Sequence, residues 1–204
     1  MLAELHDGWR EFKARTWLWV IVLQFSLINA AVAGVRDVLG PVQADRHLGG
    51  AGPYGLIVAA AAAGFVASGV MMLRWRPQRM LLVATLAILA EVVQPVLWGI
   101  PAAVWALMAG GFLMGFGIEI FGVLWETTMQ QQIPGEKLSR LYAYDMLGSI
   151  ALMPLGLAVV GPIATVVGIR ATCWGAAALV VLATLPVLAV REVRELRRDS
   201  AASA

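Results

Sequence analysis

The sequence predicts an all-α integral membrane protein in which six transmembrane helices form one bundle. Of its 204 residues, 60% are apolar and only 14% are charged, and the mean hydropathy is +0.80. A soluble domain has nearer half apolar and a quarter charged residues, so the composition excludes a soluble fold. The charged residues cluster between apolar runs of about 20 residues, the length that spans a bilayer as a helix. Barrel strands would alternate polar and apolar residues, and these runs do not.

The apolar runs set the expected domain organisation. Residues 1–15 form a polar N-terminal segment, residues 16–190 form the membrane domain, and residues 191–204 form a basic tail. The polar start and the length of the first apolar run argue against a secretory signal peptide. The predicted spans are residues 16–39, 54–73, 80–99, 102–129, 141–163 and 170–190.

The basic residues predict the orientation of the spans. Twelve of the 15 Lys and Arg residues lie in the two terminal segments and in the second-to-third and fourth-to-fifth loops. Cytoplasmic loops carry such an excess, so both termini are expected in the cytoplasm. This distribution accounts for the net charge of +2 and argues against nucleic-acid binding. Arginine-rich composition with abundant Ala, Val and Gly indicates a bacterial protein, hence the bacterial plasma membrane.

Small residues at four-residue spacing predict close helix packing. Ala60, Gly64 and Ser68 lie on one face of the second span, and Gly111 and Gly115 lie on one face of the fourth. Such faces let two backbones approach closely, which drives helix association in lipid. We therefore expect the spans to form a packed bundle.

Polar residues within the spans are the candidate pathway residues. A charge at mid-span costs roughly 2.5 to 3.5 kcal/mol, so it needs a partner, water or a function. Arg36 forms either an ion pair with Asp37 near the outer interface or part of a pathway. Glu91 and Glu119 lie deepest and face either an aqueous pathway or a neighbouring helix. The candidate set for a substrate or proton pathway is Glu119, Asn29, Arg36, Gln24 and Glu91.

A second group of charges is expected to be structural. Glu126 and Asp145 lie at the cytoplasmic ends of the fourth and fifth spans, near a basic loop. We expect them to form salt bridges with the three arginines of that loop, Arg74, Arg76 and Arg79.

Several spans contain residues that interrupt helices. Membranes tolerate such residues where neighbouring groups satisfy the freed carbonyls, and they mark either ordinary kinks or bends in moving helices. They are Pro95, Pro154, Gly156, Gly161, Pro162 and Pro186.

No motif indicates an enzyme. The sequence has no P-loop, no H-E-x-x-H, no G-x-S-x-G and no paired CxxC. Cys173 is the single cysteine, and His6 and His47 lie outside the predicted spans. We therefore expect no catalytic residues, no metal site and no cofactor.

Several segments together resemble the major facilitator superfamily of transporters. Gly117–Arg140 (GIEIFGVLWETTMQQQIPGEKLSR) is similar to the tenth span and following loop of bacterial exporters. Pro154-Leu-Gly156 and Gly161-Pro162 resemble their eleventh span. Gly69–Arg79 (GVMMLRWRPQR) resembles the family's G-x-x-x-D-R-x-G-R-R loop without its acidic residue, and Gly8–Trp19 resembles the end of the central loop.

The resemblance implies the C-terminal six-helix half of an exporter-type permease, which has about 12 spans with its site between two halves. The lipid bilayer and a second six-span half, or a second copy of the chain, are then the expected partners. The expected activity is proton-coupled efflux of a small amphipathic compound or drug. The family's cavity is lined mainly by the first and fourth spans, which ranks Glu119 first, as the proton-binding carboxylate, and Glu91 last. The alternative is a non-transporting six-span protein, either a truncated remnant or an assembly partner.

Overall fold

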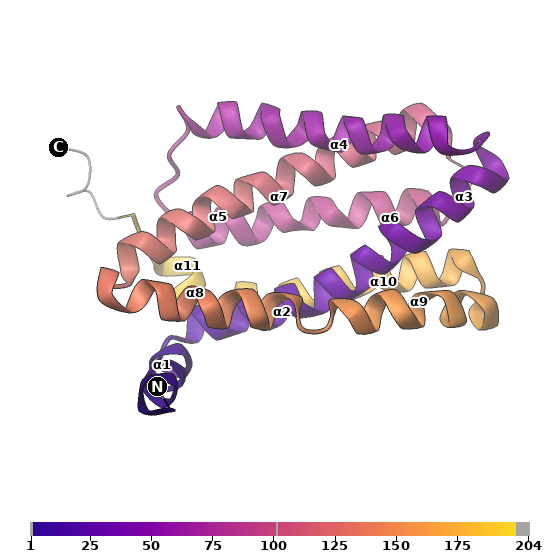
Figure 1. Ribbon diagram of the computed structural model, residues 1–204. Helices are drawn as coiled ribbons and strands as arrows, with labels where there is room; N and C mark the ends of the chain where they lie inside the picture. Colours follow the sequence, from indigo (N-terminus) through magenta and orange to yellow (C-terminus); the bar gives the residue numbers. More distant parts are fainter. Residues whose placement is uncertain (1, 101, 199–204) are drawn as a thin grey trace.

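The computed structural model describes residues 2–100 and 102–198, and it confirms the all-α membrane fold (Figure 1). Within these residues six helical segments are long and apolar enough to cross a membrane, and no strand is present. Residues 199–204 of the expected basic tail, together with Met1, lie outside the described residues. The six spans are α2–η1–α3 (Thr16–Ala33, Gly34–Leu39, Gly40–His47), α4 (Ala51–Met72), α5–η2–α6 (Met80–Ala87, Ile88–Val92, Val93–Trp98), α7 (Val104–Gln132), α8–α9 (Gly135–Ile150, Met153–Val167) and α10 (Ile169–Ala189).

The helices differ from the predicted spans where proline or polar residues shape their ends. The first helix continues to His47, past the predicted end at residue 39. It widens to π-helical geometry over Gly34–Leu39, and the Gly40 amide bonds the carbonyl of Val35, just before Pro41. Proline has no N–H to donate, so a local change of hydrogen-bond pattern precedes it.

Of the other interrupting residues, only Pro154 separates two helices. α8 ends at Ile150 and α9 begins at Met153, because Pro154 cannot bond the carbonyl four residues earlier. Pro162 and Pro186 lie inside continuous helices. The third span tightens to a 3₁₀ turn over Ile88–Val92, immediately before Pro95.

The spans pack in a pattern that repeats after three helices. The five most extensive contacts between spans join the first to the fifth and the sixth, the fourth to the second and the third, and the third to the sixth. If the first span is exchanged with the fourth, the second with the fifth and the third with the sixth, the same five pairs result. Because each unit has an odd number of spans, the second crosses in the opposite direction to the first. The contacts therefore describe two three-helix repeats of inverted topology.

Glycines make the two equivalent crossings tight. A Cβ on Gly64 of α4 would collide with the Phe112 carbonyl of α7, and one on Gly115 of α7 would collide with the Ala61 carbonyl of α4. The predicted close packing of these spans is confirmed, although Ala61 rather than Ala60 makes the contact. In the other repeat pair, a Cβ on Gly156 of α9 would collide with the Ala30 carbonyl of α2.

Two short helices cover one end of the bundle. α1 (Leu2–Ala14) and α11 (Arg191–Glu195) lie at the same end, which we call the terminal end (Figure 1). The Glu11 carboxylate of α1 accepts hydrogen bonds from Lys137 at 2.5 Å and from Arg15 at 2.7 Å. These two cations, Lys137 first, lower the pKa of Glu11 from 4.5 to about 2. The ion pairs tie α1 to the start of α8.

Candidate functional site

Glu119 lies half-buried near the middle of α7 and points toward α4. One of its carboxylate oxygens lies 3.7 Å from the place where Gly69 would carry a Cβ. This is an ordinary van der Waals distance, so the carboxylate lies against Gly69 of α4. Within the part of the chain that the structure describes, Glu119 has no hydrogen-bond or ion-pair partner.

Arg36 and Asp37 form an ion pair within the π-helical segment of the first span. The guanidinium donates two hydrogen bonds to the Asp37 carboxylate, at 2.7 and 2.9 Å. The Tyr54 hydroxyl of α4 donates to the Arg36 carbonyl at 2.9 Å. The π-helical backbone thus leaves the Arg36 carbonyl free to accept a hydrogen bond from α4. Of the two alternatives expected for Arg36, the ion pair with Asp37 is present.

Glu91 is buried in the third span, only 4% exposed, and lies close enough to Arg36 to interact with it electrostatically. Its neighbour on the same face, Gln94, is 3% exposed, and its Oε1 atom has no hydrogen-bond partner among the residues that the structure describes. Gln94 lies against Gly111 of α7. Among the described residues Arg36 and Glu91 form no ion pair, and Glu119 lies elsewhere, against Gly69 of α4.

Gln24 and Asn29, both in the predicted pathway set, each donate a hydrogen bond to a neighbouring span. Gln24 is 2% exposed and donates to Thr184 Oγ1 of α10 at 2.9 Å, so it lies between the first and sixth spans. Asn29 donates to the Ser149 carbonyl at 2.9 Å, in the last turn of α8 before the break. Helix ends in lipid need such partners, because water is absent there.

The predicted structural charge cluster does not form among the described residues. Arg74, Arg76 and Arg79 are exposed in the loop between α4 and α5, and none of them pairs with Glu126 or Asp145. Other side chains donate hydrogen bonds to these two carboxylates. The Tyr142 hydroxyl donates to Glu126, the Trp125 indole donates to Asp145 at 3.0 Å, and the Ser149 hydroxyl donates to Asp145 at 3.1 Å.

Asp145 lines a small cavity where α2, α7 and α8 meet. The cavity measures about 130 Å³, which holds roughly four waters but no drug-sized ligand. Aromatic rings form its other walls, with Phe25 and Phe121 stacked at 4.1 Å and Phe121 and Trp125 at 5.8 Å. Sequence reasoning missed Trp125 and Ser149, although the four-residue spacing of Phe121 and Trp125 on a predicted helix places both rings on one face.

Comparison of the chain with family models, with curated proteins and with solved structures finds no match. The function must therefore be argued from the bundle itself.

Proposed function

We propose that this chain forms one half of a secondary active transporter of the major facilitator type, which exports a small amphipathic compound in exchange for protons. The observation that carries the proposal is the inverted three-helix repeat in the contacts of the spans. Many secondary transporters are built from inverted repeats, with the binding site at the interface between structural units. A bundle with only a structural role has no need of this symmetry.

The burial of the spans supports a missing partner bundle. The first and fourth spans are the most buried, and the second and fifth, which the repeat relates to each other, are the least buried. A second six-helix bundle placed against α4 and α8–α9 would cover these two spans. The small cavity at Asp145 would then form part of a larger site between the two bundles.

Glu119 is the proposed proton carrier. An ionised carboxylate without a partner is costly within a span, so it must meet water, substrate or a proton. Glu119 is only half-buried, so such groups can reach it. When Glu119 binds a proton it loses its charge, which lowers the cost of moving α7 relative to the lipid. Release of the proton on the other side of the membrane restores the charge and favours the return movement of α7.

Efflux from proteoliposomes tests the proposal. The chain is reconstituted with itself or with a partner half, and pH-driven export of a cationic dye is followed. Glu119→Gln keeps the shape of the side chain and removes its charge, so we expect it to abolish pH-dependent efflux with normal expression. Glu136→Gln, at an exposed position at the start of α8, is the matched control and should transport normally.

Two outcomes would contradict the proposal. Unchanged efflux and unchanged pH dependence in Glu119→Gln would remove the proton carrier. Absence of efflux from every preparation, with the protein folded, would favour the alternative of a non-transporting six-span protein.

A further inference from the structure

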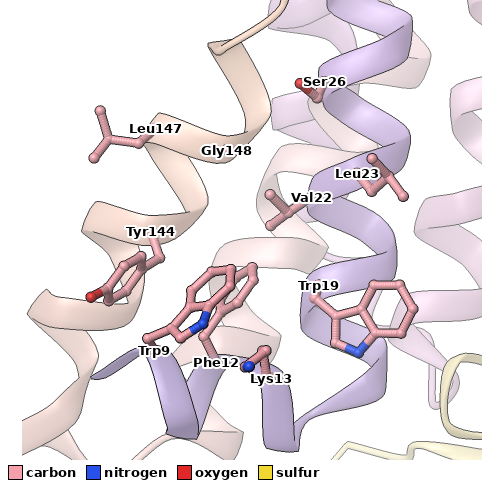
Figure 2. Close-up of a pocket in the computed structure, with 10 residues that line it drawn as sticks. All are labelled: Trp9, Phe12, Lys13, Trp19, Val22, Leu23, Ser26, Tyr144, Leu147 and Gly148. Atoms are coloured by element: carbon pink, nitrogen blue, oxygen red, sulfur yellow. The ribbon is translucent and has the colours of Figure 1, made fainter. Parts of the chain in front are cut away.

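A cavity near the terminal end opens between α1, α2 and α8, away from Glu119. It measures about 770 Å³ (Figure 2). Val22 and Leu23 of α2 form one wall, and Leu147 of α8 forms the other, so the interior is apolar. Leu147 is 67% exposed and Leu23 is 52% exposed, although both belong to spans. This groove is therefore built for an apolar occupant.

One cationic group lies at the mouth of the groove. The Lys13 ammonium lies 5.3 Å from the centre of the Trp9 ring, and Trp19 lines the same groove (Figure 2). The nearby Glu11 carboxylate already binds Arg15 and Lys137. Among the side chains that the structure describes, Lys13 has no ion-pair partner, so its ammonium can face an external anion. The two indoles are side chains that favour the bilayer interface.

The groove runs deeper along the same helix. From Trp19 to Ser26, α2 rises about 10 Å, about two thirds of the depth of one hydrocarbon leaflet. A second cavity of about 350 Å³ begins at Leu27, where α2 faces α9 and α10. Its lining is apolar apart from Thr172. The uncovered face of α2 is therefore long enough for an acyl chain.

We propose that this groove binds an anionic phospholipid from the leaflet at the terminal end of the bundle. One acyl chain lies along Val22, Leu23 and Ser26, and the phosphate lies against Lys13. An apolar groove with a single basic residue at the interface matches a lipid, because a lipid has a charged headgroup at one end and an apolar acyl chain at the other. A soluble anion would leave the apolar walls wet, and in a zwitterionic lipid the choline cation offsets the charge of the phosphate and weakens its attraction to the ammonium. The site does not depend on transport by this chain.

Lipid retention in native mass spectrometry tests the proposal on the purified full chain. Dioleoylphosphatidylglycerol and dioleoylphosphatidylcholine share their acyl chains and differ in net charge. We expect the wild type to retain phosphatidylglycerol in preference to phosphatidylcholine. Lys13→Gln should weaken phosphatidylglycerol retention about fivefold and leave phosphatidylcholine unchanged, because one basic side chain near the surface is lost.

Two further variants complete the test. Ser26→Leu puts apolar volume into the groove, so it should reduce retention of both lipids while the protein stays folded. Arg76→Gln removes one exposed positive charge from another loop at the terminal end and should behave as the wild type. Equal retention of the two lipids by the wild type would overturn the proposal. So would normal lipid retention in Ser26→Leu, or an equal loss in Arg76→Gln and Lys13→Gln.

Discussion

The crossing of α4 and α7 gives the sharpest test of the packing. Gly115→Ala adds a single methyl group, which would fall on the Ala61 carbonyl, a backbone atom that cannot rotate away. On the same helix, Gly122 has nothing within 4 Å of an added Cβ. Both substitutions give the same gain in helix propensity, roughly 0.5 to 1 kcal/mol. Only Gly115→Ala carries the additional cost of overpacking, about 1 to 3 kcal/mol.

The expected result is a difference between the two variants. Gly122→Ala should raise the free energy of unfolding by about 0.5 to 1 kcal/mol. Gly115→Ala should change it by between nothing and a loss of about 2 kcal/mol, so the two differ by about 1 to 3 kcal/mol. Titration with SDS in mixed micelles, followed by circular dichroism, measures both. Equal stabilities would refute the close approach of α4 and α7.

Three further predictions concern other contacts. Gly156→Ala should be less stable than Gly161→Ala by about 1 to 3 kcal/mol in the same titration, because only Gly156 meets a backbone carbonyl of α2. Asn29→Leu removes the donor to the carbonyl at the end of α8 and should lower stability by about 1 to 3 kcal/mol, whereas an unchanged midpoint would show that the carbonyl finds another donor. The pKa of Glu11 is about 2 in the folded protein against 4.5 for the free group, so its ion pairs stabilise the fold fully above pH 4.5, and this contribution is lost as the pH falls toward 2. Glu11→Gln should therefore be less stable than the wild type at neutral pH and should match it near pH 2 in an acid titration; parallel curves would contradict the ion pairs.

The sequence predicted the elements of the fold because membrane helices are encoded locally. Apolar length alone located six spans, and the position of Pro154 indicated where the fifth would be interrupted. The small residues at four-residue spacing indicated close packing of α4 and α7 within a bundle, although not that these two helices pack against each other. Each of these features depends on residues close together in the chain.

The partners of the polar side chains could not be predicted in the same way. Gln24 and Asn29 lie in the same helix, yet one donates to α10 and the other to the end of α8. The arginines of the second loop share the terminal end with Glu126 and Asp145, but those two carboxylates have partners on their own and neighbouring helices. Such choices depend on helix rotation and on long-range packing, which periodicity in one sequence does not determine.

Thiol labelling tests most directly the central claim that Glu119 faces a water-filled pathway. In a Cys173→Ala background, Glu119→Cys and Leu182→Cys place single thiols near mid-span, the second on the 68% exposed outer side of α10. A thiol reacts through its thiolate, which forms in water and not in lipid. With a membrane-impermeant maleimide, we expect rapid labelling at position 119 and almost none at position 182. Equally slow labelling at both positions would contradict the pathway.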